Sequence, residues 1–423
     1  MKYTAKEVLQ FTRENDVKFI RLAFSDIYGA QKNISIMPSE LEKAFTDGVI
    51  FDATAIAGFG LTSSTLKLKP DPSTLAVLPW RPSQGRVIRM YCNIYYEDGA
   101  PFVGDFRYQL SETVKKYDSL GLSARFGLEC EFYLFELDEK GNPTTTPHDN
   151  ASYFDIAPKD KGENVRRDIC LTLETMGLAP LTSHHERGPG QHEIAMKNVT
   201  PLDAADHFLT FKSVVKMVAE RNGLHASFMP KPIKSEHGSG MHINLSLYQS
   251  DENLYNHLNH PKVLSFTNGL LSKMPELLIF TNPLTNSYSR IKALQEKNAL
   301  APYDRSLVRY IKGQGDASRI ELRSPDATLN PYLVFNLMLL AGLSNIDESN
   351  SHLSEYSNSI DTMPTTMREA LRLCEKSQFL KEVMPKDILA GYIDSKNNEW
   401  MHVDKSTDIH QMELSSYFDT ALT

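Results

Sequence analysis

Carboxylates occupy one face of an apolar segment, residues 127–135 (GLECEFYLF). Glu129 and Glu131 alternate there with Leu128 and Cys130, which is the period-two pattern of a β-strand. Both carboxylates therefore project from the same face, about 6–7 Å apart along the chain. Two ionised carboxylates this close repel one another and lose hydration on burial. The sequence thus predicts positive charge between them.

Three further segments show the same alternation, with one apolar face and one face of ligand-type residues. These polar faces carry Gln191 and Glu193; His242, Asn244 and Ser246; and Arg319, Glu321 and Arg323. Glu186 stands shortly before the first of them. Each strand taken singly is also typical of a sheet with one face in water. Together, however, the faces hold five Glu, one His and two Arg, which is not the usual mixture of a solvated face.

This set of side chains predicts a site for divalent cations. Mg²⁺ and Mn²⁺ prefer carboxylate oxygens and accept a single His ligand. Zinc is less favoured because the set contains no Cys. The arginines add cationic groups suited to carboxylate or phosphate. Metals with arginines indicate phosphoryl transfer, and the sequence contains no Walker A motif that would hold the nucleotide instead.

The bulk properties exclude several other classes of protein. A chain of 423 residues predicts two domains. The net charge of −8, without a dense Lys/Arg run, argues against nucleic-acid binding. No segment is apolar enough for a membrane span or a signal peptide. The four cysteines are scattered, which favours free thiols and a cytoplasmic location.

The elements that must position these residues change character near residue 100. Before it, strands are expected at residues 17–26, 32–38 and 85–96, with a helix around residues 39–48. After it, helical patterns that stop at a glycine alternate with strands. We therefore expect a small, mostly β N-terminal domain over residues 1–100. A larger domain, residues 101–423, would carry the charged strands.

Several long motifs identify a family resemblance. GLECEFYLF, SHHERGPGQHEIAMK, ASFMPKPIKSEHGSGMHINLSL, TNPLTNSYSR and ASRIELRSPDATLNPY resemble, in this order, motifs of the bacterial class I glutamine synthetases. The chain looks like the shorter subclass, without the adenylylation loop. The resemblance implies an α+β fold: a small N-terminal β-grasp domain, then a catalytic domain with a curved antiparallel sheet flanked by helices.

The resemblance also assigns roles to residues. It implies two groups of metal ligands, namely Glu131, Glu186 and Glu193, and Glu129, His242 and Glu321. It places glutamate binding at Gly238, Arg290 and Arg323, and the nucleotide at Asn244, Ser246, Arg309 and Arg319. It makes Asp52, Glu296 and Arg305 the catalytic residues.

The implied reaction is an ATP-dependent ligation in nitrogen metabolism. Glutamate attacks the γ-phosphoryl group of ATP, and ammonia then captures the γ-glutamyl phosphate to give glutamine. Two or more Mg²⁺ or Mn²⁺ ions per site neutralise the reacting charges. Family members assemble as dodecamers with active sites between subunits, and Asp52 matches the aspartate that reaches a neighbour's site. From the residues alone, Asp52 is also typical of a turn.

Two departures from the family pattern leave the acceptor amine open. His237 stands where the family has an asparagine, and residues 291–302 (IKALQEKNALAP) replace the usual flap. Glu296 is the acid placed to substitute for the flap glutamate, although a solvated loop residue fits its surroundings as well. Alternatives are a γ-glutamyl–amine ligase using a polyamine, ethanolamine or methylamine, and a non-catalytic regulator. The C-terminal aromatic stretch is expected to pack on another subunit.

Overall fold

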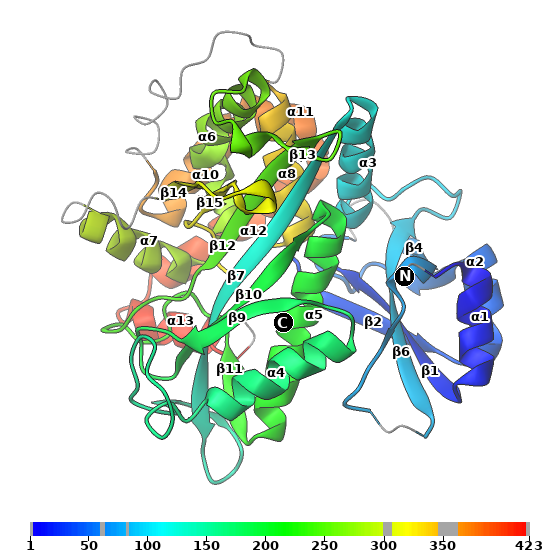
Figure 1. Cartoon of the computed structure of the whole chain (residues 1–423), viewed down its shortest axis with the longest axis horizontal. Coiled ribbons are helices and arrows are strands. Elements are labelled where there is room, and N and C mark those ends of the chain that lie inside the picture. The colour runs from blue at the N-terminus through cyan, green and yellow to red at the C-terminus, as the bar shows by residue number, and fades with distance from the viewer. Residues whose placement is uncertain (1–2, 60–63, 82–83, 299–306, 346–362, 420–423) are drawn as a thin grey trace.

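The computed structural model contains two β-sheets, one formed by the N-terminal strands and one by the strands that follow (Figure 1). It describes residues 3–59, 64–81, 84–298, 307–345 and 363–419, and for residues 293–298 the backbone alone. Within this part of the chain a six-stranded sheet precedes a nine-stranded one. The predicted α+β class with a β-rich N-terminal unit is confirmed. None of the described helices is both long and apolar enough to cross a bilayer.

The N-terminal sheet combines two long strands, β1 and β6, with four shorter ones. Its order is β2-β1-β6-β4-β3, with β5 beside β6, and only the β1–β6 pair is parallel among these neighbours. Thr4 and Glu7 form a capping box that starts the first helix. The elements are α1 (Ala5–Glu14), β1 (Val17–Ser25), β2 (Gln31–Ile36), η1 (Pro38–Glu40), α2 (Leu41–Thr46), β3 (Val49–Asp52), β4 (Thr65–Pro70), η2 (Pro72–Thr74), β5 (Ala76–Val77) and β6 (Arg86–Tyr95).

The second sheet is antiparallel throughout its described pairs and centres on one long strand, β7. Its order is β14-β15-β12-β7-β10-β9, and β8 and β11 also pair with β7 while β13 pairs with β12. The strands are β7 (Leu122–Leu137), β8 (Pro143–Pro147), β9 (Pro180–His185), β10 (Gln191–Val199), β11 (Leu224–Ser227), β12 (Met241–Gln249), β13 (Glu252–Asn253), β14 (Val308–Ile311) and β15 (Arg319–Leu322).

Some of the helices in this part of the chain cover the apolar face of the sheet, α3 and α5 on β7 and α4 on β9, whereas α7 lies on the side of the charged face. The helices are α3 (Phe106–Ser119), α4 (Glu163–Thr175), α5 (Pro201–Arg221), α6 (Pro261–Thr281), α7 (Thr285–Asn298), α8 (Pro331–Leu343), α10 (Met367–Lys376), α11 (Gln378–Val383), α12 (Lys386–Asp404) and α13 (Ile409–Tyr417), with the short turns η3 (Leu254–Asn256) and η4 (Gly315–Ala317). As predicted, α4 and α5 stop before glycines, Gly177 and Gly223, whose φ angles are 84° and 71°.

The apolar side of β7 packs on two of these helices. Phe132 contacts Phe211 of α5, with ring centroids 6.3 Å apart, and Phe126 contacts Phe335 of α8 at 4.6 Å. Cys130, on the same side, is 1% exposed, and burial raises the pKa of its thiol. The alternation of β7 therefore turns Glu129 and Glu131 to the opposite face, away from α5 and α8.

A buried network of charged and polar groups joins the two halves of the chain. Arg107 of α3 donates two hydrogen bonds to the carboxylate of Asp206 on α5, at 3.0 and 2.9 Å. It also donates to Asp71 at 2.9 Å and to Asn93 of β6 at 2.8 Å. The hydroxyl of Tyr332 on α8 donates to Asp206 at 2.6 Å. We call these five residues the junction network.

The C-terminal aromatic residues pack on β7 of their own chain. Tyr417 and Phe418 are buried in one cluster with Tyr133 and Phe135 of β7. The rings of Phe135 and Phe418 lie 4.8 Å apart. Tyr133 and Phe135 offer apolar surface within the same chain, and the aromatic rings of Tyr417 and Phe418 cover it. Contact of the C-terminal stretch with a neighbouring subunit stays a prediction.

Candidate active site

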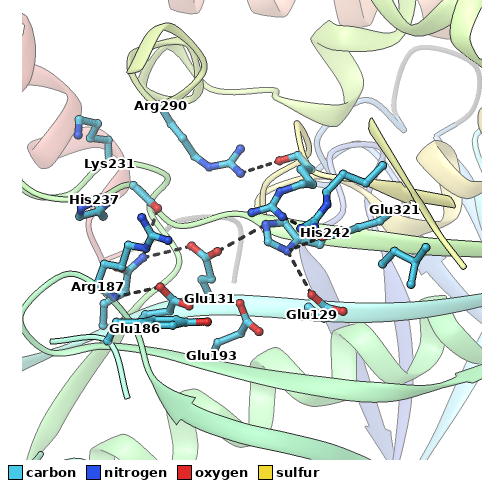
Figure 2. Close-up of a pocket in the computed structure, with 16 residues that line it drawn as sticks. Glu129, Glu131, Glu186, Arg187, Glu193, Lys231, His237, His242, Arg290 and Glu321 are labelled. Atoms are coloured by element: carbon cyan, nitrogen blue, oxygen red, sulfur yellow. Dashed lines mark hydrogen bonds and ion pairs between the residues drawn. The ribbon is translucent and has the colours of Figure 1, made fainter. Parts of the chain in front are cut away.

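A cavity of about 370 Å³ lies over the charged face of the large sheet (Figure 2). Its walls come from strands far apart in the sequence and from the loops that follow them. The lining residues are Glu129, Glu131, Tyr153, Glu186, Arg187, Gln191, Glu193, Lys231, His237, Gly238, His242, Arg290, Arg309, Ile311, Glu321 and Arg323. The five glutamates predicted from the four strand patterns thus meet in one place.

Strand register explains why the first carboxylates meet. In the β7–β10 pairing Glu131 lies directly opposite Glu193, and in the β10–β9 pairing Glu193 lies opposite His184. Directly opposed like charges destabilise a sheet. His184 Nε2 lies 3.3 Å from Glu193, while Gln191 Nε2 donates to Glu131 at 3.2 Å. Glu186 joins these groups from the turn after β9.

The second set of ligand-type residues surrounds His242. Register places His242 of β12 opposite Glu129 of β7, and Asn244 opposite Glu321 of β15. The Nδ1 atom of His242 lies 3.2 Å from both Glu129 and Glu321, and its Nε2 atom lies 3.6 Å from Glu131. His242 therefore sits between the two groups of carboxylates, as Figure 2 shows.

The two groups differ in how they carry negative charge. Burial raises the pKa of Glu186 to about 7, and repulsion from Glu131 and Glu193 adds to the effect. Burial also raises the pKa of Glu131, with a further contribution from Glu193. At Glu129 burial acts in the same direction, but hydrogen bonds from His242 and Asn244 outweigh it and lower the pKa to about 2. The Glu131 side is thus short of positive charge.

The arginines lie at the rim of the carboxylate cluster. Arg323 Nη1 is 3.5 Å from Glu321, and Arg309 also lines the cavity. Arg319 donates to Asn244 at 2.6 Å and lies 3.9 Å from Glu129. Arg290 donates from both Nη atoms to the backbone carbonyls of residues 323–325, at 2.7 to 3.2 Å. Arg290 therefore holds the segment that carries Arg323.

Three other predicted residues take different positions. Gly238 lies in the loop before β12 and lines the cavity, where an added Cβ would meet Pro230 O at 2.7 Å. Ser246 is fully buried and donates to Ser318 O at 3.1 Å, so its hydroxyl is used within the sheet. Asp52 is exposed at the end of β3 and accepts hydrogen bonds from the backbone and hydroxyl of Thr54.

Two predicted catalytic residues cannot be placed by side chain. Arg305 lies outside the described residues, and Glu296 belongs to the part of α7 whose side chains are not described. The cavity as described is built from the strands, the loop after β8, the turn after β9, the loop before β12 and the helix α7 up to Arg290.

The structure adds cavity residues that strand alternation did not single out. Tyr153, Arg187 and Lys231 come from loops, which lack the period-two signal used to find the others. Gln191 shares the polar face of β10 with Glu193, and its link to Glu131 depends on strand order rather than on sequence spacing. The available signal for Arg187 and Gln191 was the motif-like segment HHERGPGQHE, and for Lys231 the segment MPKPIK, whereas Tyr153 lies in neither.

The donor set fits hard divalent cations. Oxygen and nitrogen ligand atoms within 4.8 Å of one another occur in three groups at the cavity: Glu129, His242 and Glu321; Glu131, Glu193 and His242; and His184, Glu186 and Glu193. A site with four or five carboxylates, one or two imidazoles and no thiolate suits Mg²⁺ or Mn²⁺ better than zinc. The opposed pair of Glu131 and Glu193 is the specific feature that a bound cation would stabilise.

Comparison with protein families gives two matches that together span most of the chain. Residues 16–97 match the model "Glutamine synthetase, beta-Grasp domain", and residues 103–417 match "Glutamine synthetase, catalytic domain". A glutamine synthetase of Clostridium saccharobutylicum is 40% identical over 99% of both chains. One of Methanosarcina mazei is 40% identical over 98% of this chain and 97% of its own.

Solved structures give the same architecture. A structure described as "GmaS/ADP complex-Conformation 1" is 27% identical, with a TM-score of 0.81 over 98% of this chain and 99% of its own. A cryo-EM structure of Plasmodium falciparum glutamine synthetase has a TM-score of 0.81 at 21% identity, over 98% of this chain and 100% of its own. At this level of sequence identity, the similarity to the Plasmodium falciparum structure shows that the two chains share a fold.

Proposed function

The chain belongs to the glutamine synthetase family, and on that premise we propose that its cavity forms glutamine from glutamate and ammonia with ATP. The observation that carries the proposal is the direct opposition of Glu131 and Glu193, with Glu186 beside them, in a cavity rimmed by arginines. Such a surface binds cations and, through them, phosphate and carboxylate groups. Family members are ligases that use ATP and divalent metals, and the donor set agrees with that use.

We assign the cation ligands in two groups. Glu131, Glu186 and Glu193 would hold one ion near the glutamate. Glu129, His242 and Glu321 would hold another near the nucleotide phosphates. Figure 2 shows both groups with the other residues that line the cavity. Bound Mg²⁺ or Mn²⁺ supplies charge neutralisation, so that two anions, glutamate and ATP, approach each other.

The remaining cavity residues then act on the substrates. Arg323 would pair with the glutamate or the transferring phosphoryl group, positioned by Arg290, whose guanidinium holds the backbone of residues 323–325. Arg309 and Arg319 lie on the side of Glu129 and Glu321 and would meet the nucleotide phosphates, together with Arg305. Gly238 keeps its loop close to Arg290, which leaves room for the amino-acid substrate.

The proposed reaction proceeds in two steps. A γ-carboxylate oxygen of glutamate forms a bond to the γ-phosphorus of ATP while the bond to ADP breaks, giving γ-glutamyl phosphate. The nitrogen of ammonia then attacks the acyl carbon, and inorganic phosphate leaves. Ammonium must first give one proton to a carboxylate, and we assign this role to Asp52 of a neighbouring subunit. We assign to the carboxylate of Glu296 the second proton, which the nitrogen loses after it has attacked the acyl carbon.

Assembly and location extend the proposal. Asp52 is exposed and outside the cavity of its own chain, which agrees with sites shared between subunits in a homo-oligomer, and we propose a dodecamer. Mixing Asp52→Ala chains with chains that lack a cavity glutamate tests sharing, because restored turnover requires two subunits in one site. The four cysteines are free, in keeping with a cytoplasmic enzyme. We set the boundary between the two domains near residue 100.

The acceptor amine is the point that an experiment must decide. Phosphate release should be measured with ATP, glutamate and a panel of ammonia, methylamine, ethanolamine and a polyamine. Turnover with ammonia supports the proposed reaction, and its absence overturns it. His237 on the cavity wall favours the second candidate, a γ-glutamyl–amine ligase, since an imidazole there changes the surface offered to the acceptor. If calorimetry shows binding of neither Mn²⁺ nor ATP, both ligase proposals are overturned in favour of a non-catalytic regulator.

A further inference from the structure

A second polar cluster lies beneath the turn that joins β9 to β10, outside the cavity. The side chains of His185 and Asp149 are fully buried, and His185 Nε2 donates to Asp149 Oδ1 at 2.9 Å. The other ring nitrogen, Nδ1, lies 2.6 Å from the backbone carbonyl oxygen of Glu186. A carboxylate and a carbonyl only accept hydrogen bonds, so both ring nitrogens of His185 carry protons.

Asp149 also holds the far end of the same turn. Its Oδ1 atom accepts the backbone N–H of Gly190 at 2.9 Å and that of Ala151 at 3.1 Å, and its Oδ2 atom accepts the N–H of Lys161 at 3.2 Å. One buried carboxylate therefore fixes both ends of the turn. It reaches Glu186 through His185, and it reaches Gly190 directly.

The turn in question carries cavity residues. The backbone N–H of Glu186 donates to Gln191 O at 2.7 Å, and the N–H of Gly188 donates to the Gln191 side chain at 3.0 Å. The same Gln191 side chain donates to Glu131 at 3.2 Å. The places of Glu186 and of the group that orients Glu131 are thus both set by the conformation of this turn.

The cluster is not itself a metal site, although Asp149, His185 and His192 are close enough to hold an ion. Both nitrogens of His185 face hydrogen-bond acceptors. The Oδ1 atom of Asp149 accepts from three N–H groups, those of His185, Gly190 and Ala151. A cation would have to displace these bonds, so the chemistry of the cluster is support by hydrogen bonding.

We propose that Asp149 and His185 are positioning residues that hold Glu186 in place to bind its cation. The inference rests on the proposed function, because it takes Glu186 as a cation ligand. Neither residue lines the cavity, and both act through the backbone of the turn. Partners that orient metal ligands from behind commonly change metal affinity by about 10- to 100-fold when removed.

The test compares Mn²⁺ binding to the full chain and its variants by calorimetry. Wild-type protein and Glu186→Gln together identify the binding step that uses Glu186. Asp149→Asn should weaken that step by about 10- to 100-fold, while turnover recovers at saturating Mn²⁺ because every cation ligand is still present. A merely structural role would lower folding stability without this separation between metal affinity and turnover.

Asp160→Asn is the matched control. Asp160 is also buried and pairs with Arg166 at 2.7 Å, and Arg166 contacts His192 at 2.8 Å, so the control lies in the same neighbourhood. Its hydrogen-bond partners are Arg166 and the N–H of Gly162; it acts on His185 through its charge alone and holds no group of the turn after β9. We expect this variant to lose stability and to bind Mn²⁺ as the wild type does.

A second variant keeps the test decisive if Asp149→Asn does not fold. In His185→Asn the side-chain amide replaces Nδ1, keeps the bond to Glu186 O and loses the one to Asp149, so Mn²⁺ binding should again weaken. Wild-type affinity in a folded Asp149→Asn or His185→Asn chain would overturn the inference, as would an equal loss in Asp160→Asn. A wild-type chain without Mn²⁺ binding would overturn the proposed function as well, and this shows before any variant is compared.

Discussion

The junction network and the cavity both bury charged side chains, yet their charges are balanced in opposite ways. At the junction the guanidinium of Arg107 lies between the carboxylates of Asp206 and Asp71 and donates to both. In the cavity Glu131 faces Glu193, and the nearest arginines lie at the rim. Burial of charged side chains is common to both sites and therefore does not tell which one binds a ligand. Their charge balance does.

The difference indicates which site waits for a ligand. In a buried ion pair with complete hydrogen bonding, the protein itself compensates both charges, so no ligand is needed. Buried like charges without a partner cost folding free energy, and a protein retains them where binding of a cation recovers that cost. Glu186 shows the imbalance, since burial and its acidic neighbours raise its pKa to about 7. The following predictions test whether this contrast separates function from structure.

The largest effect is expected from Glu193→Gln. The substitution keeps the shape of the side chain and removes the charge opposite Glu131, so a cation ligand is lost and turnover should fall by at least about 10³-fold, which is about 4 kcal/mol. Without metal, the variant should unfold no more easily in urea than the wild type, because a repulsion disappears. Phosphate release and urea unfolding measure the two quantities. A variant that unfolds at lower urea concentration than the wild type and keeps its phosphate release would contradict the contrast between the cavity and the junction network.

Arg107→Met should show the opposite pattern. Removing the guanidinium leaves Asp206 buried without its cation, which we expect to lower the free energy of unfolding by about 3–5 kcal/mol. Mn²⁺ affinity of the folded fraction should stay unchanged, since Arg107 lies outside the cavity. Urea unfolding and calorimetry are the measurements. If the stability did not change, the junction network would not be a structural unit.

The metal-free protein should lose stability as the pH rises. Glu186 has a folded pKa of about 7, raised from an ordinary value of 4.5. Between these values the folded state binds more protons than the unfolded state, so its stability falls as the pH rises from 4.5 to 7, by up to about 3 kcal/mol for this group. Other buried acids such as Asp105 add to the slope, so the comparison is with Glu186→Gln. That variant should flatten the curve, and an unchanged slope would contradict the assignment.

The smallest effect is expected from Tyr332→Phe. It removes a hydrogen bond to a charged group, the one that Tyr332 donates to Asp206, and should lower the free energy of unfolding by about 1.5–3 kcal/mol. The cavity should be unaffected, with the same Mn²⁺ affinity and the same turnover. Thermal unfolding with a Mn²⁺ titration would show both. A weaker affinity would mean that the two regions are coupled.

Much of the cavity could be predicted because β-strands have a two-residue period. Glu129, Glu131, Glu193, His242 and Glu321 were found from alternation alone, since a strand with one apolar face must turn its polar residues to the other. The two-part architecture also followed from the change of pattern near residue 100. These are local properties, and a sequence records them directly.

The rest depends on pairing between distant segments. Alternation does not reveal that Glu131 lies opposite Glu193, because strand order and register come from tertiary contacts. For the same reason, the sequence does not predict the hydrogen bonds of Arg290 to the carbonyls of residues 323–325. The same holds for Tyr417 and Phe418, whose apolar character predicts burial but does not identify Tyr133 and Phe135 as the residues they pack on.

The strand order described for the large sheet sets when the ligand group of Glu129, His242 and Glu321 can form. Glu129 and Glu321 come together only after β12 has paired with β7 on one side and with β15 on the other, which requires pairing across much of the sequence. Such long-range pairing is slow compared with the formation of helices. A nascent or unfolded chain therefore does not present the group of Glu129, His242 and Glu321 in preformed shape. Divalent ions bound by this group act on the folded protein, and their concentration shifts its folding equilibrium by mass action.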